Sequence, residues 1–318
     1  MNLITIVGAR PQFIKAAAVS AALTSTAGVS QRLLHTGQHF DDNMSDVFFR
    51  ELGIPLPTWN LGLGGGSHGA MTGAQLAGIE QVLIDERPDA VLLYGDTNST
   101  LAGALAAAKL QREGVDAARV HQVGDVMHDA ALQFSALARA RAVRHPVFAA
   151  LAGRPFVLAT VHRAENTDVP DRLRVIVQAL TALGNEVDVV WPLHPRTRKV
   201  LAQRGAVLGS TASLHCVEPL GYLDMIEMEQ AAALVVTDSG GVQKETFFFG
   251  RPCVTLRDET EWIELVAAGW NRLARPTSVA ALMAAFHAAL GSVGEPVRPY
   301  GNGDAAQRIA RVLTERPA

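Results

Sequence analysis

Cysteine is scarce in this sequence: Cys216 and Cys253 are the only two among 318 residues. Two cysteines so far apart exclude a disulfide framework and a cysteine-based zinc site, and we expect both to be small buried apolar side chains in a reducing compartment. No apolar run approaches the roughly 18 residues of a membrane-spanning helix, and no basic segment precedes an apolar one at the N-terminus. The sequence therefore predicts a soluble cytoplasmic protein.

An excess of positive charge is also missing, since 28 basic residues face 31 acidic ones. This balance excludes a general basic field that would hold a nucleic-acid backbone, so any nucleotide contact is expected to be local. Apolar residues make up 48% of the chain and charged residues 19%, as in globular proteins that bury a core. The length favours two domains.

Short β-branched runs alternate with longer Ala- and Leu-rich segments, which predicts an α/β fold of two Rossmann-like, doubly wound domains with parallel sheets. The stretch Arg141–Pro155 has no clear periodicity, so we expect an N-terminal domain at 1–148 and a C-terminal domain at 149–318. The predicted strands are, in order, Leu3–Val7, Arg32–His35, Ala90–Tyr94, Arg119–Val123, Phe156–Val161, Val187–Leu193, Leu214–Glu218, Leu234–Thr237 and Cys253–Leu256.

A formal G-x-G-x-x-G pattern lies in the segment Gly62–Gly69. It would indicate a dinucleotide site if it followed a strand and opened a helix. The preceding segment, Pro55–Asn60, is a poor strand, so we favour a mobile glycine loop.

Polar residues follow the first predicted strand, at the end where a doubly wound sheet binds its ligands. Pro11 suits the first position of a helix, and Arg10 and Lys15 place two cations near that helix start. Backbone N–H groups and two cations would hold a phosphate. The alternative is a capped helix with two solvated cations.

Three further predicted strands end in residues capable of acid-base or anion chemistry. Asp96 follows the third strand and either caps the next helix or acts as an acid or base. His162 and Arg163 follow the fifth strand, and His194 follows the sixth. One such histidine is often structural, but the repetition across both domains favours a shared cleft.

The strongest local pattern is Asp238-Ser239-Gly240-Gly241 after the eighth predicted strand. Two glycines at a strand-to-helix turn let the backbone approach a diphosphate, and Ser239 adds a hydroxyl. The same four residue types surround the nucleophile of trypsin-like proteases, but those proteins are all-β, so the βα context argues against a nucleophilic serine. Glu245, further along the helix, faces either a ribose or solvent.

His35 and His39 have a spacing that binds zinc when it is helical. Gly37 between them argues against a helix, and no third ligand is near in sequence. We therefore expect no metal at this pair.

Together these segments resemble the non-hydrolysing UDP-N-acetylglucosamine 2-epimerases over nearly the whole chain. The resemblance rests on Gly8–Lys15, His35–Asp41, Gly95–Thr100, Val123–Met127, His162–Asn166, His194–Lys199, Asp238–Gly241 and Arg257–Trp262.

The resemblance implies a GT-B-like fold with a nucleotide sugar between the domains, and a last helix that packs back toward the first domain. It implies interconversion of UDP-GlcNAc and UDP-ManNAc by elimination and re-addition of UDP, in a homodimer. Because cations of the protein are available for the diphosphate and the sequence shows no acidic metal cage, we expect no cofactor or metal. Asp96 and His162 match catalytic positions. The expected substrate-binding residues are Arg10, Lys15, Arg163, His194, Ser239, Gly240, Gly241 and Glu245.

The sequence departs from the family pattern after Leu110. At this point the family pattern continues through three segments, His-Val-Glu-Ala-Gly-Leu-Arg, Pro-Glu-Glu and Pro-Thr-Glu. In this chain Gln111–Gly114 leads almost directly to Val120–Val123. About fifty residues are missing, the size of a βαβ unit plus a helix. Since carboxylates assigned to acid-base work in the family lie in that gap, we expect a shortened N-terminal sheet, retained UDP binding and weak or absent epimerisation. A non-catalytic UDP-sugar-binding protein and a GT-B glycosyltransferase remain as alternatives.

Overall fold

The computed structural model describes residues 1–38, 46–65, 67–95, 97–110, 123–141, 144–203 and 213–315. The chain separates into two compact units, the first made of residues 1–133 with the C-terminal segment from Tyr300, and the second of residues 134–299. The units divide within helix α5 (Val126–Ala140), on the N-terminal side of the stretch 141–155 expected to carry the boundary.

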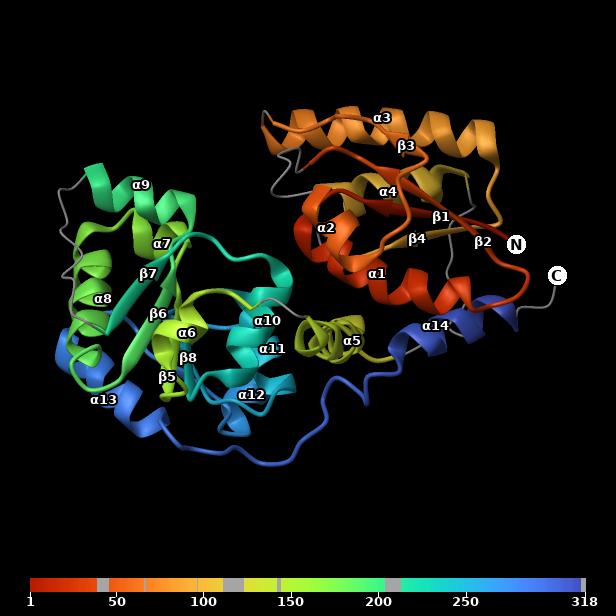
Figure 1. Ribbon diagram of the computed structural model, residues 1–318. Helices are drawn as coiled ribbons and strands as arrows, with labels where there is room; N and C mark the ends of the chain where they lie inside the picture. The colour runs from red at the N-terminus through yellow and green to blue at the C-terminus, as the bar shows by residue number, and fades with distance from the viewer. Residues whose placement is uncertain are drawn as a thin grey trace. The chain divides into compact units, whose positions relative to one another are not determined.

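The first unit contains a four-stranded parallel sheet in the order β3-β2-β1-β4. Besides the first part of α5, its elements are β1 (Asn2–Val7), α1 (Arg10–Thr24), β2 (Ser30–His35), α2 (Asp46–Leu52), β3 (Trp59–Asn60), α3 (His68–Glu86), β4 (Ala90–Leu93), α4 (Asn98–Leu110) and α14 (Ala305–Thr314). Figure 1 shows α3 and α4 on one face of this sheet and α1 on the other.

The last helix, α14, contacts α1 within the first unit. It begins where the backbone N–H groups of Ala305 and Ala306 donate to the carboxylate of Asp129, at 3.1 and 2.7 Å. A carboxylate at a helix N-terminus satisfies donors that cannot bond within the helix. This contact attaches the C-terminal segment to α5 although the residues are far apart in sequence.

The second unit contains a six-stranded parallel sheet in the order β10-β9-β8-β5-β6-β7. Its elements are α6 (Val147–Leu151), β5 (Phe156–Thr160), α7 (Ala164–Thr167), α8 (Pro170–Leu183), β6 (Asp188–Pro192), α9 (Pro195–Gln203), β7 (Leu214–Val217), α10 (Tyr222–Ala231), β8 (Leu234–Thr237), α11 (Gly240–Phe248), β9 (Cys253–Thr255), α12 (Ile263–Ala267), β10 (Asn271–Leu273) and α13 (Val279–Ala289).

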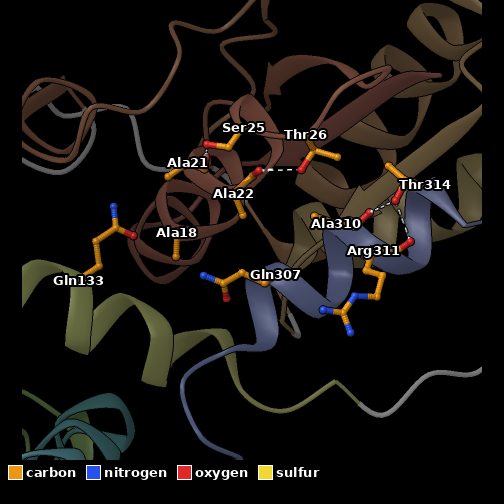
Figure 2. Close-up of a pocket in the computed structure, with 10 residues that line it drawn as sticks. All are labelled: Ala18, Ala21, Ala22, Ser25, Thr26, Gln133, Gln307, Ala310, Arg311 and Thr314. Carbon is orange, nitrogen blue, oxygen red and sulfur yellow. Dashed lines mark hydrogen bonds between the residues drawn. The ribbon is translucent and has the colours of Figure 1, made fainter.

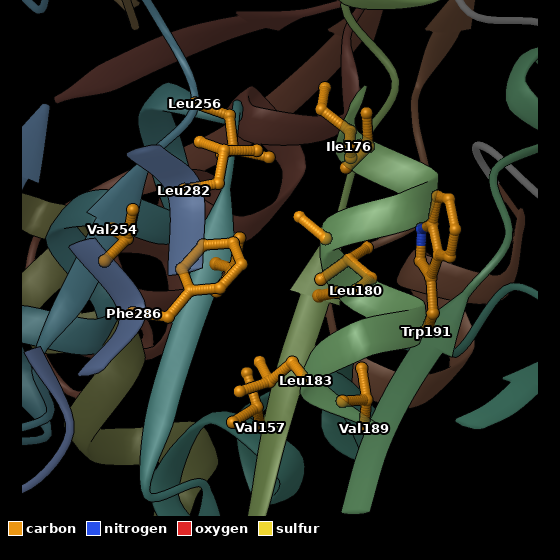
Figure 3. Packing of buried hydrophobic residues seen from close by; sticks show 14 of the residues in the cluster. Val157, Ile176, Leu180, Leu183, Val189, Trp191, Val254, Leu256, Leu282 and Phe286 are labelled. Carbon is orange, nitrogen blue, oxygen red and sulfur yellow. The ribbon is translucent and has the colours of Figure 1, made fainter. Parts of the chain in front are cut away.

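Both faces of this sheet are buried, as near-continuous apolar strands require. On one face Leu180 and Leu183 of α8 and Phe286 of α13 pack against strand residues such as Val157 and Trp191 (Figure 3). On the other face α6, α10 and α11 cover the strands. The strands are thereby fixed in place, and so are the loops that follow them.

The described elements match the predicted α/β pattern, with three differences. The strands β3 and β10 were not predicted, because two or three residues carry too little pattern. Most of the predicted strand Arg119–Val123 lies outside the described residues. Cys216 was expected to be buried and is exposed, because it lies on β7 at the edge of the sheet, whereas Cys253 is buried.

None of the helices within the described ranges combines the length and the apolar character needed to cross a bilayer.

Candidate functional site

Four neighbouring strands of the second unit are followed by polar residues at their carboxyl ends. The order β9, β8, β5, β6 is parallel, so the loops that follow these strands lie side by side. These loops carry His162 after β5, His194 after β6, Ser239 after β8 and Glu261 after β9. The topology thus collects residues that the sequence spreads over about a hundred positions.

Asp238 lies among these carboxyl-terminal strand ends and is completely buried. Its carboxylate accepts from the backbone N–H groups of His162, at 3.1 Å, and Arg163, at 3.0 Å. The side-chain amide of Asn166 donates to it at 3.0 Å and to the carbonyl of Leu256 at 2.9 Å. One acidic side chain therefore ties the loop after β5 to the end of β8, and through Asn166 to the end of β9.

The two predicted histidines lie together. Nδ1 of His162 is 3.3 Å from a carboxylate oxygen of Asp238, while the side chain stays 38% exposed. The ring of His194 is 5.3 Å from the ring of His162, centre to centre, and tilted by 34°. His194 is exposed, and its Nδ1 accepts the backbone N–H of Arg196 at 3.2 Å. Two imidazoles therefore lie side by side at the carboxyl ends of β5 and β6, and both are accessible to solvent.

The glycine-rich turn begins α11, as predicted. The Ser239 backbone N–H donates to the Thr237 hydroxyl at 2.9 Å, and the Ser239 hydroxyl does not cap the helix. The first backbone N–H groups of α11, from Gly240 onward, have no partner within the helix itself. Gly241 is exposed, so this helix start is open to an anion.

The loop between β9 and α12 closes against the same turn. The indole N–H of Trp262 donates to the carbonyl of Gly240 at 2.9 Å. A Cβ added to Gly240 would lie 2.6 Å from an oxygen of Glu261, so a side chain here would require the end of the Glu261 side chain to shift. The residue pattern around Trp262 was noted in the sequence only as part of a resemblance, and no local signal assigned it to this contact.

Glu261 places a negative charge near the guanidinium groups of Arg163 and Arg257. Burial raises the pKa of its carboxyl, but its own backbone N–H and the guanidinium groups of Arg257 and Arg163 outweigh burial and lower it. Arg257 donates to Glu261 at 2.7 Å. The carboxylate therefore stays ionised and orients the arginines.

Glu245 does not face solvent. Its carboxylate is buried on α11 and accepts the hydroxyl of Tyr222 at 2.9 Å. Of the two orientations expected from the sequence, the solvent-facing one is wrong, because α10 packs over this side of α11.

In the first unit a buried glutamine, Gln12, joins two strand ends. Its Oε1 accepts the backbone N–H groups of Gly8 and Ala9, at 2.7 and 2.9 Å. Its Nε2 donates to the Tyr94 carbonyl at 2.9 Å and to the hydroxyls of Thr97 and Thr100. Gln12 therefore fixes the turn that carries Arg10 relative to the loop after β4, a link that sequence reasoning missed.

Arg10 opens α1 and Lys15 lies further along the same helix. The Lys15 ammonium reaches the loop after β4, since a Cβ at Gly95 would be 3.8 Å from it. Asp96, the predicted acid or base of that loop, lies outside the described residues.

His35 is a core residue. It is buried, its ring stacks on Phe13 with centres 5.2 Å apart, and its Nδ1 accepts the backbone N–H of Gly37 at 3.0 Å. His39 lies outside the described residues. Across the parts of the chain that are described, no three His, Cys, Asp or Glu side chains gather as a metal site.

The glycine segment 62–69 does follow a strand, contrary to our expectation, because Trp59–Asn60 pairs with the end of β2. The loop is attached there: the Leu63 N–H donates to the Thr36 carbonyl at 2.8 Å. A Cβ on Gly37, whose φ is +85°, would lie 2.6 Å from the backbone of Gly62. Glycine at position 37 therefore permits a close approach of two backbones.

A cavity of about 510 Å³ lies elsewhere in the first unit, between α1, α5 and α14 (Figure 2). Ala18 and Ala22 form part of its wall, with Gln133, Gln307 and Arg311 around them. At 1.5 Å per residue, Ala22 lies about 18 Å along α1 from Arg10. The cavity is therefore separate from the strand ends.

Comparisons with known proteins connect this chain to one family of enzymes. A sequence model of the family described as UDP-N-acetylglucosamine 2-epimerase matches residues 21–112 and 107–314. The chain is 44% identical to the UDP-2,3-diacetamido-2,3-dideoxy-D-glucuronate 2-epimerase of Pseudomonas aeruginosa, over 99% of this chain and all of that protein. It is 35% identical to the UDP-N-acetylglucosamine 2-epimerase of Methanocaldococcus jannaschii, over 99% of each chain.

A solved structure of that archaeal enzyme, in complex with UDP-GlcNAc and UDP, is similar over 99% of each chain, with a TM-score of 0.86 and 33% identity.

The comparisons also reveal an internal gap. The alignment with the Pseudomonas protein runs over 368 positions, whereas this chain has 318 residues, so about fifty positions lack a counterpart here. The family match is split where its two parts meet, at 107–112. This is the place at which the sequence departs from the family pattern.

Proposed function

The chain belongs to the UDP-N-acetylglucosamine 2-epimerase family, and we propose that it inverts C2 of a UDP-linked 2-acetamido sugar by eliminating UDP and adding it back. The residues at the carboxyl ends of the strands in the second unit carry this proposal. It presents His162, Arg163 and the open start of α11 around one buried carboxylate. Imidazole, guanidinium and helix N–H groups are what a leaving diphosphate needs.

The proposed reaction has two half-reactions. A base removes the C2 proton while the bond between C1 and the diphosphate oxygen breaks, which gives a glycal and bound UDP. The diphosphate oxygen then attacks C1, and an acid delivers a proton to the opposite face of C2. The intermediate stays committed only if UDP is retained between the steps, so tight diphosphate binding serves turnover directly.

In the second unit we assign the diphosphate to Ser239, Gly240 and Gly241, with Arg163 as the nearby cation. The dipole of α11 favours the negative charge that develops on UDP as it leaves. His162 stabilises that charge or exchanges a proton, and His194 contacts the substrate beside it. Glu245 completes the set from its buried position on α11 as a UDP-binding residue.

In the first unit we assign Asp96 as a group that exchanges the C2 proton, and Arg10 and Lys15 as cations for the diphosphate. A carboxylate at a strand end suits proton exchange. These cations, together with the helix starts, replace the divalent metal that many diphosphate sites use. We therefore expect turnover to continue in EDTA.

Two substrates fit the proposal. The family name points to UDP-GlcNAc and UDP-ManNAc. The 44% identity to the Pseudomonas enzyme favours a second candidate, a UDP-2,3-diacetamido uronate, because that identity exceeds the 35% shared with the archaeal UDP-GlcNAc enzyme. The two differ in charge at C6 and in the group at C3, so the relative values of kcat/KM will separate them.

We further propose that the active form is a homodimer, as the family resemblance implies, and that it works in the cytoplasm, where its two unpaired cysteines stay reduced. Light scattering on the purified chain checks the dimer.

Product analysis tests the proposal. The chain is incubated with UDP-GlcNAc and, separately, with the diacetamido uronate, and sugars and nucleotides are identified by NMR. We expect the C2 epimer of at least one substrate, still linked to UDP. Transfer of the sugar to an added acceptor would instead indicate a glycosyltransferase, and binding of UDP without any product would indicate a binding protein.

A further inference from the structure

Asp238 is more than a cap for the turn after β5. Its Oδ2 accepts three donors: the backbone N–H groups of His162 and Arg163 and the Asn166 amide. These contacts to Oδ2 already provide an acceptor for the N–H donors of the turn. Its Oδ1 accepts the His162 N–H and also lies 3.3 Å from Nδ1 of the His162 ring.

A carboxylate that is fully enclosed is costly unless its lone pairs are met by donors. At an ion-pair distance of 3.3 Å, the negative oxygen attracts an Nδ1 that carries a proton and repels the lone pair of an unprotonated Nδ1. Asp238 thus selects the His162 tautomer with the proton on Nδ1. The other nitrogen, Nε2, lies on the opposite side of the ring, on a side chain that remains 38% exposed.

We propose that Asp238 is a positioning residue that holds the His162 imidazole with Nδ1–H toward the carboxylate and Nε2 toward the substrate. The direction of Nε2 follows from the ring, and its task toward a nucleotide sugar rests on the proposed function. In this orientation neutral His162 has an unprotonated Nε2 that accepts a proton. Protonated His162 donates from the same atom to the leaving diphosphate.

The His194 ring supports the same orientation. Its centre lies 5.3 Å from that of His162 and its plane is tilted by 34°, so the contact between the two rings limits movement of the His162 ring. A swing of His162 out of this arrangement would exchange the positions of its two nitrogens.

The variant Asp238→Asn tests the tautomer directly. Its single oxygen is expected to replace Oδ2, which has three donors, and its NH₂ group then faces Nδ1. The negative charge that favoured a proton on Nδ1 is then gone, so we expect the proton on Nε2 instead. Long-range ¹H–¹⁵N spectra of histidine-labelled protein report this exchange, and His162→Asn identifies the signal among the ten histidines.

The matched control is Asp188→Asn in the same unit. Asp188 is also buried and accepts from a histidine, His215 Nε2, at 2.8 Å, but it lies at the opposite ends of the strands. Both variants should lose stability. We expect kcat to fall by about 10²–10⁴ in Asp238→Asn only, with KM changed by less than about threefold, because the lost group orients an acid-base imidazole.

An unchanged His162 tautomer in Asp238→Asn, or equal kcat in the two variants once the folded fraction is matched, would overturn the proposal. The spectra do not depend on turnover. If the wild-type chain produces no epimer, the proposed function fails, and the tautomer still decides whether Asp238 positions His162. If Asp238→Asn does not fold, the wild-type spectra still decide, because a neutral His162 with its proton on Nε2 would overturn the proposal.

Discussion

At the scale of single residues, the buried carboxylates of Asp188 and Asp238 have different roles. Asp188 accepts from Arg154 at 2.7 Å and from His215 at 2.8 Å, at the amino ends of the strands. Asp238 accepts from the loop that carries His162, at the carboxyl ends. The sequence predicted His162 from its place after a strand, but it could not predict the partner Asp238, because 76 residues separate the two.

Replacing Asp188 by asparagine should destabilise the protein at neutral pH and not in acid. The hydrogen bond from Arg154, opposed by burial and aided by His215, lowers the pKa of Asp188 below 3.8. A lowered folded pKa adds stability that is present above the unfolded value and is lost as pH falls through the folded value. We expect a loss of about 1–3 kcal/mol at pH 7.

Urea unfolding of wild type and Asp188→Asn between pH 7 and pH 3 measures this. The difference between the two should shrink below about pH 4. A difference that stays constant down to pH 3 would show that the charge of Asp188 is not what stabilises the unit.

Replacing Lys15 by alanine should weaken UDP binding about ten- to a hundredfold, because a charge-assisted phosphate contact is worth about 1.5–3 kcal/mol. Calorimetry with UDP measures the effect. Arg174→Ala removes an exposed cation on α8 and serves as the control. Equal affinities in the two variants would remove Lys15 from the site.

Element by element, the strand-to-helix turns define the site, and the two glycines of α11 have different tasks. A Cβ on Gly240 would displace the end of the Glu261 side chain, whereas a Cβ on Gly241 would meet nothing closer than 4.0 Å. The pattern Asp-Ser-Gly-Gly predicted this turn because strand, glycine and helix are neighbours in sequence. The short strands β3 and β10 escaped prediction, since their pairing comes from tertiary contacts.

Gly241→Val should therefore weaken UDP binding by about tenfold or more while changing the melting temperature little, because the new side chain covers the helix start and its Cβ has space. Gly240→Ala displaces the end of the Glu261 side chain, so we expect a small decrease in the melting temperature. Thermal unfolding and UDP calorimetry on the pair measure both effects. A Gly241→Val protein that binds UDP normally would contradict a backbone site at α11.

At the scale of the whole molecule, the two units follow the predicted α/β pattern, and the main departure is a gap of about fifty positions relative to the Pseudomonas protein. The sequence located this gap because the family motifs before and after it are intact. It could not locate Gln12 as the residue that joins the ends of β1 and β4, because buried hydrogen bonds leave no periodic signal.

Inserting the relative's missing segment after Leu110 should raise kcat by about 10²–10⁴ and change UDP affinity by less than about threefold. The residues assigned to the diphosphate are present already, whereas the family resemblance places acid-base carboxylates in the missing segment. Steady-state kinetics and UDP calorimetry on both chains measure this. Equal kcat values would show that Asp96 and His162 suffice.

The central claim, that this chain breaks and remakes the C2–H bond of a UDP-linked 2-acetamido sugar, is tested most directly in D₂O. NMR follows the C2 position of UDP-GlcNAc, or of the diacetamido uronate, during incubation with the chain and with His162→Asn. We expect deuterium at C2 of the epimer, formed about 10²–10⁴ times more slowly by the variant. Recovery of both substrates with hydrogen at C2 and no epimer, while UDP still binds, would contradict the account.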